Sequence, residues 1–409
     1  MHLQRNALHN ELHARPSTYF DAPAQVFHLA FLDEDDAAGA IIRTLCKRHI
    51  ALADPSEPQG EFPVGSARLK WERHTEFLTL TLVMPGAQPA PWPALPPVLA
   101  EVVEHYSALL INADQIQVES EETWGGDIDT YSFHDPVGSN LDGSNATVWS
   151  DLRLNGNGLN HMLVLNRQFD SRRLGRMVRR LLEIETYRLM ASLTLPVARS
   201  LSGELRQYEH ELVELSDANA TTDSHDAKAL LARITRLSAR VTQTQARTRL
   251  RFSATEAYSQ LVFERIDELH ESRTGDCQQL GTFIAQRFRP TVRYCASIDQ
   301  RLGRIGDAVA QLGNLLQARI QVEMEAQNSQ ILQSLSTRAD TQIKIQKAVE
   351  GLSIIAISYY LFNLFKLLYQ GLLTLGLNLT PRAALLAGTP IALLMIGTIL
   401  HQIRNTRRH

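Results

Sequence analysis

The sequence predicts an α+β cytoplasmic domain followed by long α-helices and a C-terminal two-helix transmembrane hairpin. Twelve of the 16 prolines and all four tryptophans fall in the first 150 residues, which is typical of short elements joined by turns. Between Pro196 and Pro381 there is only one proline, Pro290, so long helices are expected there. The predicted parts are the α+β domain at 1–170, a coiled-coil-like region at 171–350, the hairpin at 351–403 and a basic cytoplasmic tail at 404–409.

In the first part, alternation of apolar and polar residues with a period of two predicts half-buried strands. Leu78, Leu80 and Leu82, for example, alternate with threonines. The predicted strands are 24–33, one or two strands within 67–84, 114–119, and a hairpin of 147–154 and 159–166 around the turn Asn155–Gly158. Helices are predicted at 36–52 and 97–111.

From Ser171 the apolar spacing changes to three and four, the spacing of one helix face. We expect a helix from there to about Thr194, and a second from Pro196 through Leu215. The next segment, 216–226, is rich in loop residues. The remaining predicted helices are a long one from Leu230 to about Ser272, ended by Gly275, and another after Pro290 that continues into the first apolar segment.

The two apolar segments, 351–375 and 383–403, are each close to the roughly 20 residues that a helix needs to cross a bilayer. The short connection between them forces antiparallel neighbours. Basic residues lie before the first segment and after the second, whereas the connection offers only Arg382. The positive-inside rule then predicts two spans in an inner membrane, with both termini cytoplasmic. The alternative is a pair of buried core helices, which rarely contain two consecutive runs of spanning length.

One face of the first apolar segment is polar, and its residues recur at spacings of three, four and seven: Ser353, Tyr360, Asn363, Lys366 and Gln370. Polar groups in hydrocarbon usually face a protein interior or a water-filled path, so this face predicts a pore or a polar helix–helix seam. The alternative is that Lys366 and Gln370 lie near the outer end of the helix and extend to the interface.

The overall composition excludes some classes of protein and leaves cofactors unspecified. The 41 basic and 44 acidic residues give a net charge of −3, which does not predict a nucleic-acid-binding protein. The N-terminus is polar and basic without the apolar core of a signal peptide. Three scattered cysteines, Cys46, Cys277 and Cys295, predict reduced thiols in a cytoplasmic body and no zinc site.

Two polar clusters carry residue types that are used in chemistry. His9 and His13 have the i, i+4 spacing of metal ligands, but Glu11 does not share their face and no third ligand is evident, so no metal site is predicted. The alternative is a polar N-terminal cluster that docks on the body by charge-assisted hydrogen bonds, formed by His9, Glu11, His13 and Arg15.

The second cluster, Glu72, His74 and Glu76, shares one side of a predicted strand. Such a row could act as a general base, but an ion-paired or solvated sheet face is the more ordinary interpretation. The sequence contains no G-x-S-x-G, H-E-x-x-H or C-x-x-C motif and no P-loop lysine. We therefore do not predict an enzyme.

The segments NELHARP, WERHTEF, TVWSDLRL and VEGLSIIAISYY together resemble an uncharacterised bacterial domain-of-unknown-function family with membrane-anchored members. The layout also resembles that of the CorA-type magnesium channels, which are homopentamers whose first spanning helices line the pore. The Gly-Met-Asn signature of those channels is absent, because the corresponding region reads YQGLLTLGLN.

Two functional hypotheses follow from these observations. The first is an oligomeric ion channel or transporter of the inner membrane, with a CorA-like layout and unspecified selectivity. It requires several copies of the chain, since a single hairpin cannot enclose a path. The alternative is a membrane-tethered scaffold or regulatory protein without transport activity. Both make the lipid bilayer a partner of the chain.

Overall fold

The structure is a computed structural model that describes residues 2, 5, 16–49, 54, 56–87, 90–221, 226–375, 382, 386, 388–391, 393–394 and 396–398. The chain divides into two compact units, Met1–Leu316 and Gln317–His409. The first unit contains a β-sheet with helices on both faces and the greater part of the long-helix region. The second unit contains the remainder of the last long helix.

Within the described residues, the first unit is built around one mixed sheet of nine strands. Its order is β2-β3-β4-β1-β5-β8-β7-β6-β9. Neighbouring strands are antiparallel, except that β5 and β8 are parallel. The strands are β1 Ala24–Leu32, β2 Gln59–Val64, β3 Ala67–Arg73, β4 Phe77–Pro85, β5 Leu110–Ser120, β6 Val137–Leu141, β7 Ala146–Leu154, β8 Asn160–Asn166 and β9 Ser272–Arg273.

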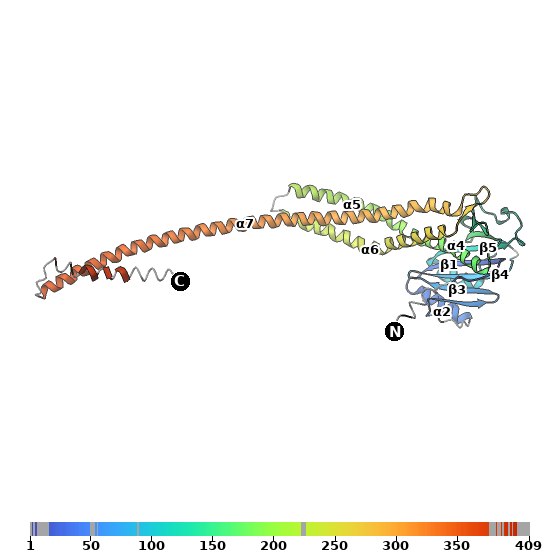
Figure 1. The fold of residues 1–409 in the computed structure, drawn as a ribbon, viewed down its shortest axis with the longest axis horizontal. Helices are drawn as coiled ribbons and strands as arrows, with labels where there is room; N and C mark the ends of the chain where they lie inside the picture. Colours follow the sequence, from blue (N-terminus) through green and yellow to red (C-terminus); the bar gives the residue numbers. More distant parts are fainter. Residues whose placement is uncertain are drawn as a thin grey trace. The chain divides into compact units, whose positions relative to one another are not determined.

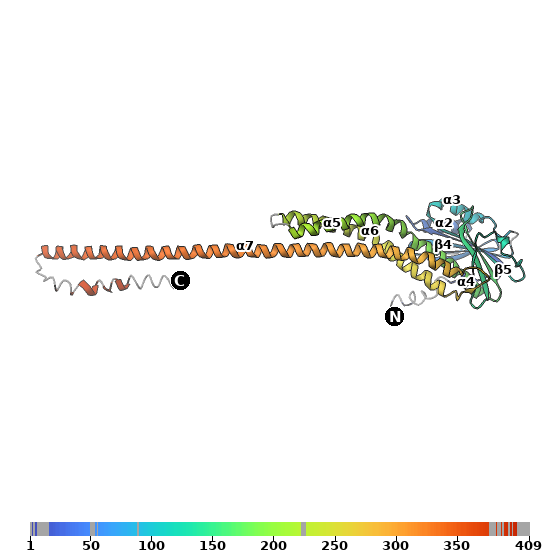
Figure 2. The same cartoon turned by 90° about the horizontal axis from the view of Figure 1, so that it is seen from above.

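Helices cover both faces of this sheet. Helices α2 (Ala37–His49) and α3 (Pro97–Tyr106) pack on one face, and α4 (Ser171–Ser192) packs on the other (Figures 1 and 2). Strand β1 reads as an almost continuous apolar run because both of its faces are buried. Phe27 and Leu29 enter the core beneath α2, and Val26 enters the core beneath α4.

Three long helices follow α4: α5 (Thr194–Thr221), α6 (Ala227–Asp267) and α7 (Leu280–Thr374). Within the first unit they lie side by side in both ribbon views (Figures 1 and 2). Their buried residues recur at spacings of three and four, including on α7 Ile298, Leu302, Ile305, Val309, Leu312 and Leu316. An added Cβ at Gly306 would lie 2.9 Å from Gln245 of α6, so this glycine permits a close approach of the two helices.

The predicted α+β domain followed by long helices is confirmed. The region 67–84 forms two strands, β3 and β4, and the predicted strands near 24–33 and 159–166 are present. Helix α4 begins after Asp170, whose side chain accepts a hydrogen bond from the backbone N–H of Arg173 at 2.7 Å.

Several predicted element boundaries were wrong. The predicted helix 97–111 ends at Tyr106, because Leu110 begins β5 and pairs with Phe31 of β1. Helix α5 extends to Thr221, into the predicted loop. Helix α7 begins at Leu280, so Pro290 lies inside it. Buried residues on both sides of the proline, Phe288 and Cys295, pack the helix there. Strands β2, β6 and β9 were not predicted.

The first predicted apolar segment lies within α7, which continues without a break to Thr374. Among the described residues, α7 is the one helix with the length and apolarity needed to cross a bilayer. Its qualifying 18-residue window has a mean hydropathy of 1.5 and buries none of its residues. The connection at 376–381, most of 383–403 and the tail at 404–409 lie outside the described residues. The transmembrane hairpin and its two-span topology therefore stay predictions.

Candidate functional site

Pro16, the last residue of the segment NELHARP, and the segment WERHTEF lie beside a small polar cavity between the sheet and α4. This cavity has a volume of about 50 Å³, and Glu72, His74 and Phe77 of the second segment line it. Lys70 Nζ donates a hydrogen bond to the carbonyl oxygen of Pro16, the last residue of the first segment. By volume, the cavity has room for roughly three or four water molecules. It is called the polar cavity below.

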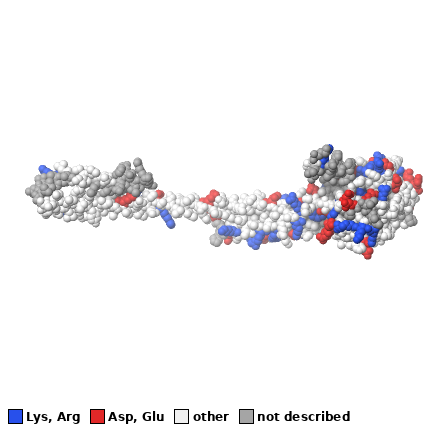
Figure 3. Space-filling model, turned by 90° about the horizontal axis from the view of Figure 1, so that it is seen from below, with Lys and Arg blue, Asp and Glu red and all other residues white. Residues whose placement is uncertain are grey.

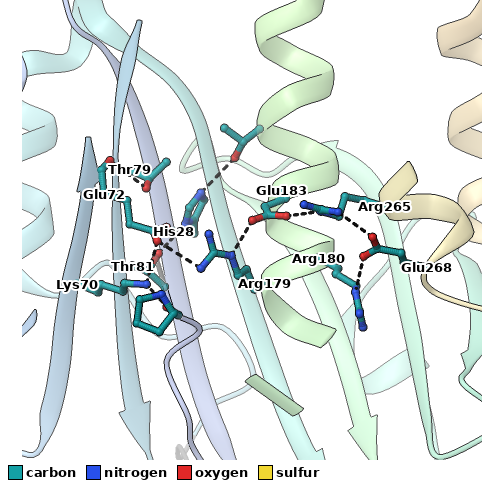
Figure 4. A network of polar contacts seen from close by, with 12 residues as sticks. His28, Lys70, Glu72, Thr79, Thr81, Arg179, Arg180, Glu183, Arg265 and Glu268 are labelled. Atoms are coloured by element: carbon teal, nitrogen blue, oxygen red, sulfur yellow. Dashed lines mark hydrogen bonds and ion pairs between the residues drawn. The ribbon is translucent and has the colours of Figure 1, made fainter. Parts of the chain in front are cut away.

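A continuous network of ion pairs forms one wall of the polar cavity (Figure 4). Glu72 Oε1 accepts from Lys70 Nζ at 2.9 Å and lies 3.3 Å from Arg179 Nη1. Arg179 Nε in turn donates to Glu183 Oε1 at 2.6 Å. The network therefore connects strand β3 to helix α4.

The same network continues from α4 to α6 (Figure 4). Glu183 Oε2 accepts from Arg265 Nε at 2.5 Å, and Arg265 Nη1 donates to Glu268 Oε1 at 2.9 Å. Arg180 Nε closes the series by donating to Glu268 Oε2 at 2.8 Å. Burial raises the pKa of the Glu183 carboxyl, but Arg179 and Arg265 outweigh burial and leave that pKa below its usual range.

His28 lies deeper in the polar cavity, on β1. Its Nδ1 is 2.8 Å from Thr81 Oγ1 and its Nε2 is 3.1 Å from Thr186 Oγ1 on α4. Complete burial lowers the pKa of His28 from 6.5 to about 4, so the ring is neutral at neutral pH. Because both ring nitrogens are hydrogen-bonded, this histidine has no free nitrogen with which to accept a substrate proton.

A buried polar row extends from Thr186 across the sheet. Asn112 Nδ2 donates to Thr186 Oγ1 at 3.1 Å and to Asp114 Oδ2 at 2.6 Å, while Asn160 Nδ2 donates to Asp114 Oδ1 at 2.8 Å. Burial, assisted by the charge of Glu185, raises the pKa of Asp114 from 3.8 to about 7. The face of the sheet beneath α4 thus contains a titratable carboxyl in an otherwise satisfied network.

The predicted row of Glu72, His74 and Glu76 is only partly brought together. Glu72 belongs to the ion-pair network, and the His74 ring stacks on Phe77 with centroids 4.2 Å apart. Glu76 Oε2 instead accepts from Arg251 Nη2 at 3.0 Å and from the Tyr258 hydroxyl at 3.1 Å, both on α6. Both carboxylates are engaged with cations, so this geometry favours the ion-paired interpretation of the row.

The second predicted site is the polar face of α7, and all five of its residues are exposed: Ser353, Tyr360, Asn363, Lys366 and Gln370. The Ser353 hydroxyl donates to the carbonyl oxygen of Val349 at 2.8 Å, one turn earlier. The third predicted cluster, His9, Glu11, His13 and Arg15, lies outside the described residues. Within the described part of the chain, no group of three or more His, Cys, Asp or Glu residues is placed to hold a metal ion.

Sequence reasoning missed His28 of the polar cavity, Asp114 of the buried polar row and Arg179 of the ion-pair network. A signal was present for the first two: each is an ionisable residue at an inward position of an otherwise buried strand. Such residues are rarely buried without partners. Arg179 gave no comparable signal, because α4 has arginines on several faces.

A family described as "Protein of unknown function (DUF3422)" has a model that matches residues 1–407 of this chain. The match contains all the segments on which the predicted resemblance was based, and it confirms that resemblance. A search of the curated proteins gave no significant match, and neither did a search of the solved structures.

Proposed function

We propose that this chain, which belongs to the DUF3422 family of proteins of unknown function, is a homo-oligomeric inner-membrane protein with a CorA-like layout. It forms an ion channel or transporter in this proposal. The observation that carries this proposal is an uncovered row of residues along α7. Among the described residues, no side chain of α7 after Leu316 is buried.

This row, called the α7 seam, follows alternating spacings of four and three. Its apolar members are large and more than half exposed, as for Ile345 and Val349 at 60% each. The seam consists of Met324, Asn328, Ile331, Leu335, Arg338, Gln342, Ile345, Val349 and Leu352. A heptad pattern of this kind is typical of helices that pack against other helices through that side.

We infer that further copies of the same chain cover the α7 seam. Parallel copies inserted in one membrane present identical residues at the same depth, so their seams come into register without further adjustment. Asn328 and Gln342 each have an amide that both donates and accepts, which allows them to pair with their own copies. Arg338 does not pair with itself, but its long side chain can extend to solvent.

The register of the seam continues into the apolar segment of α7, and this connects the oligomer to the polar face. The next seam positions are Ala356, Tyr359, Asn363, Lys366 and Gln370. Three of the five predicted polar residues thus occupy seam positions, and Ser353 and Tyr360 are adjacent to them. In a bundle of parallel copies, Asn363, Lys366 and Gln370 would face the common axis, where polar groups are least costly in a membrane.

The charge of Lys366 separates this proposal from a magnesium channel. A ring of lysines at the axis repels cations and attracts anions. Together with the missing Gly-Met-Asn signature, this favours passage of anions over passage of Mg²⁺. On the face drawn in Figure 3, charged side chains are sparse along the apolar part of α7, so one lysine has a large local effect.

A membrane-tethered scaffold or regulatory protein is the second candidate. Two observations favour it: the Ser353 hydroxyl is already satisfied within the helix, and the polar cavity is too small for an ordinary substrate. In this case the α7 seam would still assemble copies of the chain, but the membrane segment would serve as an anchor.

The oligomer is tested by measuring the mass of the detergent-solubilised full-length protein, as wild type and with one seam residue changed. Ile345→Asp should reduce it to monomers, because a charge at a buried seam position is not compensated. Ile343→Asp is the matched control, since Ile343 is 50% exposed but lies off the seam. A wild-type protein that is monomeric, or equal effects of the two variants, would contradict the oligomer.

Transport is tested separately by ion flux into liposomes that contain the wild-type oligomer. Anion flux that falls sharply in Lys366→Gln supports the channel. An intact oligomer with no flux for anions or cations supports the scaffold instead.

A further inference from the structure

A second pocket in the first unit lies beside the irregular end of strand β7 and is independent of the polar cavity. It has a volume of about 310 Å³ and is bounded by β7, α4 and α7. Each of these elements contributes an arginine to the wall: Arg153, Arg188 and Arg287 respectively. Phe283 and Phe288 of α7 provide an apolar side. This space is called the arginine pocket below.

The three guanidinium groups are held in different ways. Arg188 is fixed by Glu185, with Nε–Oε1 and Nη2–Oε2 distances of 3.0 and 2.6 Å, which leaves its Nη1 for another acceptor. Arg287 lies over the Phe283 ring, with its Cζ 3.6 Å from the ring centroid. Among the described residues, neither Arg153 nor Arg287 forms an ion pair with a carboxylate.

The one carboxylate in the wall is Asp151, and it is committed to the backbone. Its Oδ1 accepts from the Arg153 N–H at 3.1 Å, and its Oδ2 accepts from the His134 N–H at 3.0 Å. Its charge offsets one of the three guanidinium groups, and Glu185 offsets that of Arg188. The arginine pocket consequently has an excess of positive charge with unused donors, which is the complement of an anion.

The pocket depends on an irregularity in the sheet. The register of β7 against β8 shifts between Ser150 and Leu154, and Leu152 within this bulge has a φ of +52°. A large side chain is rarely found at positive φ, and bulges redirect neighbouring side chains. Ser150 Oγ stabilises the bulge by accepting from the Leu152 N–H at 3.0 Å. The bulge places Arg153 at the pocket, opposite Arg287 of α7.

We propose that the arginine pocket binds a small organic anion, with a phosphate or carboxylate head group on the arginines and an apolar body against Phe283 and Phe288. Guanidinium groups match both head groups with paired, charge-assisted hydrogen bonds. A volume of about 310 Å³ corresponds to the lower end of the size range of small-molecule sites. Because β7, α4 and α7 all contribute, a bound anion would join the sheet to α7, the helix that carries the apolar segment.

Calorimetric titration of the full-length detergent-solubilised protein tests this proposal with four probes: phenyl phosphate, benzoate, inorganic phosphate and phenol. Phenyl phosphate or benzoate should bind, and the stronger of the two identifies the head group. Inorganic phosphate should bind at least about tenfold more weakly than phenyl phosphate, and phenol should not bind detectably. The affinity should fall with added salt, since the contacts are charged and partly exposed.

Arg287→Ala should weaken binding of the best probe by about tenfold or more, and Arg287→Lys should restore only part of it, because lysine lacks the paired donors. Arg153→Ala provides an independent second variant. The matched control is Arg293→Ala, an exposed arginine on another side of the same helix. The proposal would be overturned if none of the anions bound at concentrations up to about 10 mM. Equal weakening by Arg287→Ala and Arg293→Ala would also overturn it.

Discussion

Glu72 Oε1 lies 3.3 Å from Arg179 Nη1, and this ion pair joins strand β3 to helix α4 at the edge of the polar cavity. Lys70 donates to the same carboxylate oxygen at 2.9 Å. All three side chains are largely withdrawn from solvent, and burial lowers the pKa of the Lys70 ammonium. The carboxylate of Glu72 is therefore a counter-charge that Lys70 and Arg179 share, and Glu183 is a second counter-charge for Arg179.

Replacing Glu72 by glutamine should destabilise the first unit strongly. Glu72→Gln leaves Lys70 without its paired carboxylate and Arg179 with Glu183 alone, and breaking a buried pair in this way typically costs about 3–5 kcal/mol. The measurement is urea unfolding of the full-length protein in detergent, followed by tryptophan fluorescence, because all four tryptophans lie in the first 150 residues.

An exposed ion pair supplies the control for this variant. Glu211 and Arg240 are 2.7 Å apart, with side chains 29% and 47% exposed. Glu211→Gln should change the free energy of unfolding by less than about 1 kcal/mol. Similar losses in the two variants would show that the network at the polar cavity has no special structural role.

Asp114 should make the protein less stable as the pH rises. Its pKa is about 7 in the folded chain and near 3.8 when unfolded, so between these values the folded state binds the additional proton. Stability from this group is fully present below about pH 4 and is lost as the pH rises through 7. The loss is on the order of a few kcal/mol, since each pKa unit corresponds to about 1.4 kcal/mol.

The test is the pH dependence of urea unfolding in Asp114→Asn, which remains neutral at every pH. The difference in stability between variant and wild type should shift in favour of the variant between about pH 4 and pH 7. A constant difference across that range would show that Asp114 titrates normally in the folded protein.

His28 should produce the opposite slope. Its pKa is about 4 in the folded chain and 6.5 when unfolded, so on acidification the unfolded state takes up the proton first. Stability from this group is present above pH 6.5 and is lost as the pH falls towards 4, by roughly 3 kcal/mol. In His28→Gln this acid-sensitive component should disappear. If the variant lost as much stability on acidification as the wild type, His28 would not be a neutral, buried histidine in the folded protein.

Gly175 should be intolerant of any side chain. A Cβ at this position of α4 would lie 2.2 Å from the carbonyl oxygen of Thr18, so the N-terminal segment 16–20 crosses the helix only because residue 175 is a glycine. Gly175→Ala should push this segment from the helix, lower the thermal stability and expose the segment to limited proteolysis.

The control is a helical glycine with free space around it. A Cβ at Gly203 of α5 would meet nothing within 4 Å, so Gly203→Ala should be neutral or stabilise by roughly 0.5–1 kcal/mol through helix propensity. Equal behaviour of the two alanine variants would rule out the close crossing at Gly175.

The sequence by itself determined the elements whose signals are local. Helix α4 was predicted because burial of one helix face leaves a periodic apolar pattern, and strand β1 was predicted from a nearly continuous apolar run. The apolar part of α7 was predicted from length and composition alone. The same local signals misplaced the start of β5 and missed β9, because pairing with distant strands decided those residues. The resemblance to a family was likewise carried by contiguous segments.

Only the tertiary structure decided which polar residues meet. Glu76 and Arg251 are 175 positions apart, and His28 and Thr186 are 158 apart, yet each pair is in hydrogen-bond contact. A residue's charge is written in the sequence, but its partner depends on the sheet order and on the face that α4 covers. The polar cavity and the arginine pocket each combine residues from distant parts of the chain in this way. A buried charge is stable only where the fold brings its counterpart, and short-range periodicity contains no information about that counterpart.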